Sequence, residues 1–517
     1  MSRQSFVYGA LILLTASFIN RIIGFIYQMI MIRLIKPEGI GLFNMVFPVY
    51  ILMLVLASLG IPVAISKLVA EEIAKKNYRG AHRIFRICLF FLISSSLLLT
   101  ALLVVGSPLL LKYVFPNPKV YYIFLCLIPG VFLVSICSAF RGYFQGLQQM
   151  APTAITQTLE QLMRVSAGLC IAYFLLPRGI EYAAMGLSLG VVIGELTGCL
   201  TMLYFYFKGR SQINRTSGSL PEPFQQSCSR IFNLGIPVTL SRFVSTLLMS
   251  ADAVIIPQRL QAAGLSLTEA TSVFGLLIGV AETLLFTPTM ITIALATALI
   301  PAISDALALE NRQLVRNRTS VAVRITCGVG LPCAVAFFLL PQEMCGVLFG
   351  YKEAGKILWV LAIGGPFLYF QQTTTGILQG MGEAMRPFKN LMLASVFKIF
   401  GLYYLTSIPK LGILGSCLAL NLCYILMALL NYYDLKKLIG YQINLSHDII
   451  KPLLASGGMG LVIWQIKIFL LPYSSLLTLI VSLIAGGFVY LLLLFLLGGI
   501  HRKDFLRIKG ALGDRFF

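Results

Sequence analysis

Apolar runs long enough to cross a lipid bilayer fill almost the whole of this 517-residue chain. A bilayer core requires about 20 apolar residues per helix, and lipid offers the backbone no outside hydrogen-bond partner. We therefore predict an all-α integral membrane protein with 14 transmembrane helices. The runs lie near residues 6–35, 42–67, 87–114, 120–145, 153–177, 182–207, 230–257, 267–304, 319–341, 356–380, 388–406, 411–434, 449–471 and 475–499.

The composition excludes a soluble domain, since 58% of the residues are hydrophobic and only 11% are charged, against about 25% charged in soluble domains. The first run lacks a small-x-small cleavage site, so it is not expected to be a removed signal peptide. The eleven cysteines show no C-x-x-C spacing, and the three histidines fall in polar loops. We expect no disulfide framework, no metal and no cofactor.

The net charge of +21 is distributed by loop, which argues against nucleic acid as a partner. Most of the basic residues outside the apolar runs lie in alternate loops, as the positive-inside rule describes for cytoplasmic loops. We expect a multi-pass protein of the cell membrane with both termini in the cytoplasm. The basic loops include Lys75, Lys76, Arg79, Arg83, Arg86, Lys208, Arg210, Arg215, Arg230, Arg312, Arg316, Arg318, Arg324, Lys436 and Lys437.

A sequence pattern occurs twice, as "RGYFQGLQQMAP" at 141–152 and as "GILQGMGEAMRP" at 376–387. A second pair, "VAISKLVAE" at 63–71 and "PAISDALAL" at 301–309, occurs in the same order. These pairs indicate a duplication of six helices. An even number of spans per half makes the two repeats parallel, which is a known transporter architecture.

The duplication predicts an N-terminal six-helix lobe over 1–210 and a C-terminal six-helix lobe over 230–438. A cytoplasmic linker over 211–229 joins them, and 439–517 holds two extra helices with a basic tail. In each copy of the pattern, we expect the glycines to allow a tight turn and the proline to open the next helix.

Two arginines stand halfway along apolar runs, Arg21 in the first and Arg242 in the seventh. A cation at mid-bilayer costs ~2.5–3.5 kcal/mol on insertion scales, so such residues are functional candidates. Both come from equivalent helices of the two halves and are expected to face a central cavity that binds substrate. The alternative is an ion pair, for example Arg242 with Asp252 or Glu282.

Other charges inside the spans have two interpretations each. Arg33 and Lys67 lie at span ends, where they either bind substrate or extend to the lipid headgroups. Glu160 and Arg164 have the spacing and order of a helical ion pair, and a proton or cation relay is the alternative. Glu195, together with Asp252 and Glu282, is a further relay candidate.

No catalytic constellation is present, so we do not expect an enzyme. A transferase acting on polyprenyl phosphates needs loop carboxylates to hold a metal against pyrophosphate. The only adjacent acidic pair, Glu71 and Glu72, lies beside a basic loop and is expected to be a solvated helix end.

Several motifs together resemble the stage V sporulation protein B family, in the polysaccharide-transporter branch of the multidrug/oligosaccharidyl-lipid/polysaccharide exporter superfamily. The resemblance covers nearly the whole chain and implies fourteen helices in two lobes plus a C-terminal pair. The motifs are "NRIIGF" (20–25), "GIPVAISKLVAEE" (60–72), "RGYFQG" (141–146), "LEQLMR" (159–164), "GIEYAAMG" (179–186) and "TALIPAIS" (297–304).

A more distant resemblance to the lipid II flippases bears on the site. Their first-helix pattern, Arg-x-x-Gly-Phe followed by a second arginine, is met by Arg21, Gly24 and Arg33. The sequence departs from them at Tyr27, where those flippases tend to carry another cavity arginine. Lys67 partly compensates for this lost charge.

The resemblance implies a flippase that moves a lipid-linked precursor, carried on undecaprenyl pyrophosphate, outward for spore cortex peptidoglycan. Arginines suit the pyrophosphate of such a cargo. The expected partners are this lipid-linked glycan, membrane lipids and cell-wall synthases. Two alternatives remain open: a drug or cation antiporter, which would require carboxylates in its cavity, and a non-transporting scaffold for cortex synthesis.

The predicted topology is testable by cysteine labelling of intact cells. Lys112→Cys should react with a membrane-impermeant maleimide, and Arg79→Cys should react only after the cells are opened, because the basic loops lie inside. The unsubstituted protein gives the background from native cysteines. Labelling of position 79 from outside would refute the orientation.

Overall fold

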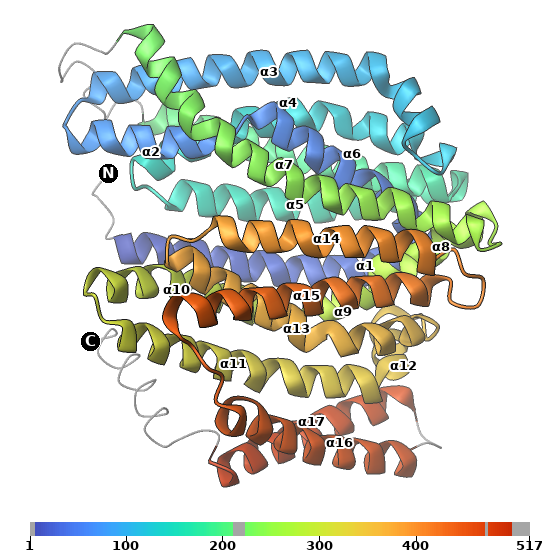
Figure 1. The fold of residues 1–517 in the computed structure, drawn as a ribbon. Helices are drawn as coiled ribbons and strands as arrows, with labels where there is room; N and C mark the ends of the chain where they lie inside the picture. Colours follow the sequence, from blue (N-terminus) through green and yellow to red (C-terminus); the bar gives the residue numbers. More distant parts are fainter. Residues whose placement is uncertain (1–5, 210–222, 471–473, 499–517) are drawn as a thin grey trace. The chain divides into compact units, whose positions relative to one another are not determined.

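A computed structural model describes residues 6–209, 223–470 and 474–498, and this part of the chain is helical with short connections (Figure 1). The chain forms two compact units, residues 1–275 and 276–517. The all-α prediction is therefore confirmed. The first unit holds α1 (Phe6–Ser58), α2 (Ile61–Ala74), α3 (Tyr78–Tyr113), α4 (Tyr121–Gly146), α5 (Ala151–Leu175), α6 (Ile180–Gly209), α7 (Phe224–Ala262) and nearly all of α8 (Leu267–Leu276).

The first helix, α1, is two helices joined by a break at Lys36, whose φ of 61° and ψ of 169° are not helical. Pro37 follows and begins the second segment, since its fixed φ suits a first helical position. A second break falls at Leu59 and Gly60, both with positive φ. The span expected over 42–67 is thus interrupted between α1 and α2.

Gly60 is required by packing as well as by its backbone. A Cβ on Gly60 would lie 2.3 Å from the carbonyl oxygen of Gly235 on α7. Helix α7 therefore crosses the junction of α1 and α2 at backbone distance and contacts both helices.

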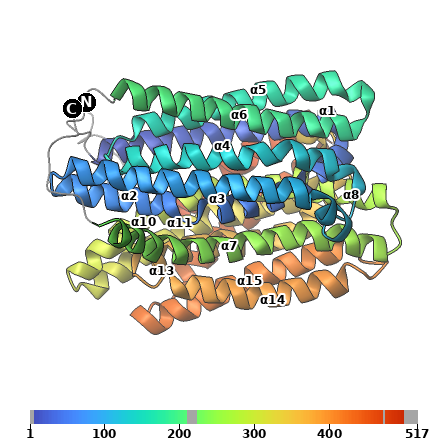
Figure 2. The same ribbon diagram turned by 90° about the horizontal axis from the view of Figure 1, so that it is seen from above.

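The interior of the first unit is apolar and partly aromatic. Helix α6 packs along α4 and α5, which lies beside it in Figure 2, and α2 packs on α3 and α4. Phe85 of α3 lies 4.5 Å from Tyr143 of α4, ring centroid to centroid, and 5.3 Å from Phe140. These contacts fix α3 and α4 side by side.

The second unit is centred on α13, which packs against α10, α11 and α15, while α14 covers α15. The expected span over 267–304 is divided by a π-helical stretch, Leu277–Glu282, and by a turn at Thr287–Pro288. The unit holds α9 (Thr283–Phe286), α10 (Thr289–Ala308), α11 (Arg312–Leu339), α12 (Pro341–Met344), α13 (Ala354–Gly380), α14 (Met385–Leu405), α15 (Ile413–Ile439), α16 (Lys451–Phe469) and α17 (Ser475–Leu496).

The C-terminal pair, α16 and α17, is joined to the same unit by polar contacts as well as by packing. Tyr490 on α17 donates a hydrogen bond of 2.6 Å to the Gly328 carbonyl on α11. Lys467 on α16 lies 3.0 Å from Glu343 on α12. Hydrogen bonds and ion pairs of this kind help to hold membrane helices together, because lipid tails are as apolar as the helix surfaces and give no hydrophobic driving force.

Twelve of the described helical segments are long and apolar enough to cross a membrane, so the count of 14 spans stays a prediction. Helices α13 and α14 are not among the twelve, because polar residues interrupt them. Helix α13 carries the stretch "QQTTT" at 371–375, and α14 carries Arg386, Lys389 and Lys398. The long α1 counts once, although Lys36 divides it.

The two copies of the repeated pattern end in the same turn. After α4, the Gln148 and Gln149 N–H groups donate to the carbonyls of Gln145 and Phe144. After α13, the N–H groups of residues 382 and 383 donate to the carbonyls of 379 and 378 in the same order. Both are Schellman turns, in which the residue after the C-cap takes positive φ. That residue is Gln148 in one copy and a glycine at 382 in the other.

The glycines that both copies share therefore do not form the turn, which corrects the sequence interpretation, although the additional glycine at 382 in the second copy does. Gly142 and Gly146 lie within α4, where they allow this helix to contact α2. A Cβ on Gly142 would lie 2.6 Å from the Pro62 carbonyl oxygen, and one on Gly146 would lie 2.9 Å from that of Ser66.

The second copy repeats this contact inside the second unit. A Cβ on Gly376 would lie 2.6 Å from the Ala296 Cβ, and one on Gly380 would lie 2.8 Å from the Ile300 carbonyl oxygen. By packing, α10 thus stands where α2 stands. The contacts of Gly142 and Gly376 align Pro62 of α2 with Ala296 of α10. The sequence pairing of 63–71 with 301–309 instead aligns residue 62 with residue 300, one helical turn later.

A methyl group at these glycines should destabilise the protein. We expect Gly142→Ala and Gly376→Ala each to lower the unfolding free energy by about 1–3 kcal/mol, because the contacted atoms are backbone or a short side chain that cannot move aside. Thermal unfolding of the purified protein in detergent measures this.

Gly106→Ala on α3 is the matched control, because a Cβ there has nothing within 4 Å. It should leave stability unchanged or raise it by ~0.5–1 kcal/mol, as helix propensity favours alanine. Equal effects of Gly106→Ala and Gly142→Ala would contradict the packing role.

Candidate functional site

Helices α5 and α6 pack at backbone distance through glycines placed every fourth residue. Gly190 of α6 faces Gly168 of α5, and a Cβ on Gly190 would lie 2.3 Å from the Gly168 Cα. A Cβ on Gly194 would lie 2.8 Å from the Glu160 carbonyl oxygen. Small residues at this spacing let membrane helices approach closely. This approach places the side chains of Glu160 and Glu195 in one layer.

That layer is a network of four charged side chains. Arg164 Nη2 on α5 lies 2.8 Å from Glu160 Oε1 and 2.7 Å from Glu195 Oε1 on α6. Arg141 on α4 forms an ion pair with the other oxygen of Glu160. The four side chains are only 8% to 21% exposed. The network therefore ties three helices together with two positive and two negative charges.

The two positive and two negative charges of the network cancel. A buried charge is tolerated in a low-dielectric interior only when paired and hydrogen-bonded. Glu160 accepts from two arginines, and Arg164 donates to two carboxylates. The geometry is that of an ion-pair network that holds α4, α5 and α6 together. A role of these side chains as a proton or cation relay stays a prediction.

Two tyrosine hydroxyls of α1 lie beside the network. Tyr27 and Tyr50 are buried, and both interact electrostatically with Arg164. A Cβ on Gly168 of α5 would lie 3.0 Å from the Tyr27 hydroxyl. The Tyr50 hydroxyl lies against Gly130 of α4 in the same way. The Tyr27 side chain is therefore packed against α5.

The predicted cation sites on α1 are exposed rather than buried. Arg21 and Arg33 both have exposed side chains, while Gly24 is half-buried, with its Cβ position 3.6 Å from Gln161 Nε2 on α5. Gln161 adjoins Glu160, so this part of α1 lies level with the network. Arg21 takes part in no ion pair among the described residues.

Lys67 on α2 and Arg242 on α7 are exposed as well. Lys67 lies 4.0 Å from Glu71 Oε1, with 59% of its side chain exposed. Within the described part of the first unit, Arg242 forms no ion pair. The structure therefore brings Glu160 and Glu195 of α5 and α6 together and leaves the four predicted cation sites of α1, α2 and α7 exposed.

The two other predicted acids do not join the network. Asp252 on α7 and Glu282, in the π-helical stretch of the second unit, are half-buried and each is engaged in other polar or electrostatic contacts. Their role as relay residues stays a prediction. Across the described ranges, no group of three or more His, Cys, Asp or Glu side chains is placed to hold a metal ion.

Sequence reasoning missed one member of the network and misread an acidic pair. Arg141 lies inside the predicted span over 120–145, and a buried charge there requires a partner. Glu72 is buried, 3% exposed, instead of solvated. It accepts a hydrogen bond of 2.8 Å from Asn77 Nδ2 and lies 3.4 Å from Arg230 Nη1 on α7, which also pairs with Glu71.

The family can be assigned by comparison with known proteins. Residues 6–307 match the model of the family described as polysaccharide biosynthesis protein, and residues 272–404 match that of the MatE family. The first match covers more than half of the chain. The chain belongs to the polysaccharide biosynthesis protein family.

Two relatives and one solved structure place the chain further. It is 33% identical to stage V sporulation protein B of Bacillus subtilis (strain 168), over 86% of each protein. It is 22% identical to the lipid II flippase MurJ of the same organism, over 97% of each. The solved inward closed structure of a lipid II flippase MurJ superposes with a TM-score of 0.72 at 16% identity, covering 93% of this chain and 97% of that one. The fold is thus a membrane transporter fold.

Removing one acid from the network should destabilise the protein strongly. Glu160→Ala leaves Arg141 without its carboxylate, and removing one partner of a buried pair costs about 3 kcal/mol or more. Unfolding of the purified protein in detergent, at equal lipid content, measures the loss.

Glu353→Ala is the matched control, because this glutamate is exposed at the start of α13. It should change stability by less than about 0.5 kcal/mol. In Arg141→Ala/Glu160→Ala, the loss should be smaller than the sum of the two single losses. Additive losses would show that the two side chains do not interact.

Proposed function

We propose that this protein is a flippase that moves a lipid-linked glycan precursor, carried on undecaprenyl pyrophosphate, outward across the cell membrane. The proposed use of the precursor is spore cortex peptidoglycan. The names of the relatives support this reading, since one is a sporulation protein and another a lipid II flippase.

The observation that carries the proposal is the unpaired state of Arg21. It lies some fifteen residues into α1, and no described carboxylate neutralises it. A cation at that depth is stable only if it faces water or an anionic ligand. We infer that Arg21 faces a water-filled cavity and binds the pyrophosphate there, with Arg33, Lys67 and Arg242 as further cationic contacts.

The same charges disfavour the antiporter alternative. An exporter of cationic drugs needs free carboxylates in its cavity, and the two acids of the buried network are not free. Glu160 and Glu195 are engaged by arginines. The outward-facing side chains on α1 and α2 are positive, which suits an anionic cargo.

The energetics require no dedicated ion site. Moving negative charge outward along the membrane potential is favourable by ~2.3 kcal/mol per charge per 100 mV. Alternating access would then come from the two six-helix repeats, proposed as residues 1–210 and 230–438. We place both termini in the cytoplasm and propose cell-wall synthases as receivers of the product.

Arg21 provides the direct test. Arg21→Ala should lower the rate of flipping by roughly 30- to 150-fold, the equivalent of losing ~2–3 kcal/mol of charge-assisted contact. Arg21→Lys should restore the rate only in part, because an ammonium lacks the planar fork. The assay uses purified protein in vesicles with a defined undecaprenyl-pyrophosphate-linked substrate.

Arg178→Ala is the control, because Arg178 is an exposed arginine in the short connection after α5. It should flip at the unsubstituted rate. Full activity of Arg21→Ala at normal membrane abundance would refute the cargo role. Loss of abundance would instead assign Arg21 a structural role and overturn the proposal.

A further inference from the structure

We propose that a cavity in the second unit binds one acyl chain of an anionic phospholipid, with its headgroup held at the basic end of α11 and α15. The cavity has a volume of about 330 Å³. This site is independent of the proposed transport function, because all of its residues lie within 276–517 and none is a predicted cargo contact.

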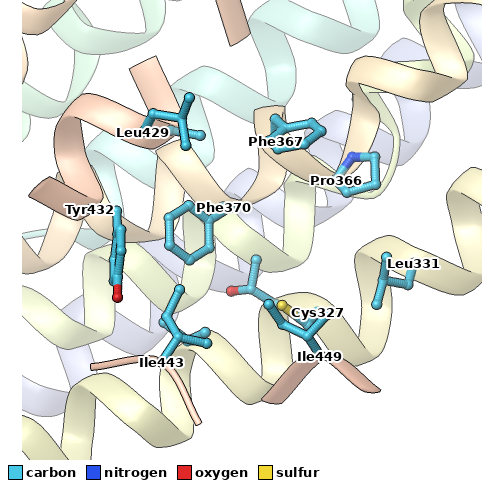
Figure 3. A pocket seen from close by; sticks show the side chains of 12 residues that line it. Cys327, Leu331, Pro366, Phe367, Phe370, Leu429, Tyr432, Ile443 and Ile449 are labelled. Atoms are coloured by element: carbon cyan, nitrogen blue, oxygen red, sulfur yellow. The ribbon is translucent and has the colours of Figure 1, made fainter. Parts of the chain in front are cut away.

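The walls of the cavity are almost wholly apolar. Figure 3 shows the side chains of α11, α13 and α15 around one space, with Ile443 and Ile449 at one edge. The only hydroxyl of α11 in the wall, that of Thr326, is already bonded to Thr373 at 2.7 Å. Beyond this pair, the wall offers only the Tyr432 hydroxyl and the Cys327 thiol as polar groups, too few to hold ordered water. The lining residues are Val323, Thr326, Cys327, Leu331, Pro366, Phe367, Phe370, Ala428, Leu429, Tyr432, Ile443 and Ile449.

The cavity is not sealed. Leu429 is 54% exposed, and Phe370 and Tyr432 are half-buried. The apolar solvent available to helices of a membrane protein is lipid, so a hydrocarbon chain is the occupant that this opening admits. Tyr432 presents an apolar ring and a polar hydroxyl, as aromatic residues do at the boundary between lipid tails and headgroups.

Basic side chains follow at one end of this apolar wall. On α15, Lys436 stands one turn after Tyr432 and on the same helix face. On α11, Arg316 lies on the face that carries Val323 and Cys327, two turns nearer the helix start. The Arg316 guanidinium donates from Nε to the Ile439 carbonyl and lies against Gly440.

This contact brings the two cations to the same place. Because Gly440 N–H donates to the Lys436 carbonyl, the Arg316 guanidinium is held at the last turn of α15. The remaining N–H groups of Arg316 and the exposed ammonium of Lys436 suit a phosphate. Two acids lie near this end, and both are already paired: Asp448 with Arg324 at 3.4 Å and Asp434 with Arg386 at 3.0 Å. They therefore leave the charges of Arg316 and Lys436 uncancelled.

The charge decides between lipid classes. A zwitterionic lipid would fill the cavity with the same chain but gain little from the two cations. An anionic headgroup gains the attraction, and each cation near a membrane surface is worth about a fivefold change in binding of anionic lipid. We therefore commit to an anionic phospholipid such as phosphatidylglycerol.

The experiment measures lipid retained by the full-length protein. Protein purified from vesicles of equal phosphatidylglycerol and phosphatidylcholine is washed with detergent, and the bound phospholipids are quantified by mass spectrometry. We expect about one phosphatidylglycerol per chain, enriched over phosphatidylcholine. Arg316→Gln and Lys436→Gln should each reduce the enrichment about fivefold, whereas Lys389→Gln, an equal charge change on α14, should not.

A second variant tests the cavity itself. Cys327→Phe fills the wall without changing charge and should abolish retention of both lipids. If its melting temperature shows misfolding, Leu429→Trp at the opening serves in its place. Equal retention of the two lipids, or no effect of Arg316→Gln and Lys436→Gln, would overturn the headgroup assignment. Displacement of phosphatidylglycerol by undecaprenyl phosphate at equal concentration would assign the cavity to the cargo tail instead and refute the proposal.

Discussion

The absence of hydrogen-bond partners in lipid governs this structure. A charge or a backbone polar group left alone in the hydrocarbon core carries a cost of several kcal/mol, so every such group must be paired, hydrated or placed at an end. The Schellman turns after α4 and α13 satisfy the helix-terminal carbonyls, and the arginines of α4 and α5 satisfy the glutamates between them. The fold is the arrangement in which these demands are met inside each unit.

The same demand divides the charged residues into two groups. Those of α4, α5 and α6 cancel one another and fix three helices in place. Four cations of α1, α2 and α7 remain exposed, namely Arg21, Arg33, Lys67 and Arg242, and Arg21 has no described counter-charge. Charges that cancel hold a bundle together, and charges that do not cancel are available to a ligand. The proposed cargo contact follows from this contrast.

Much of the fold could be predicted from the sequence, because apolar run length and the placement of basic loops are local signals. The helical class was accessible in this way, and the family was accessible from motifs such as "NRIIGF" and "RGYFQG". The break at Lys36 falls between the runs predicted over 6–35 and 42–67. The break at Leu59 and Gly60 and the division of the span over 267–304 could not be predicted, since they depend on backbone packing between distant segments. The pair Glu160 and Arg164 has a helical spacing that reveals it, whereas its partners Arg141 and Glu195 come from other helices and require the three-dimensional register.

The glycine contacts between α5 and α6 have a mechanical consequence. Gly190 sits over Gly168 with room for hydrogen atoms only, so a shift of one residue along either helix would drive a side chain into the facing backbone. The two helices can neither slide nor roll against each other and must move as one stiff rod. Any change of shape in the first unit is therefore confined to joints that lack such interlocking.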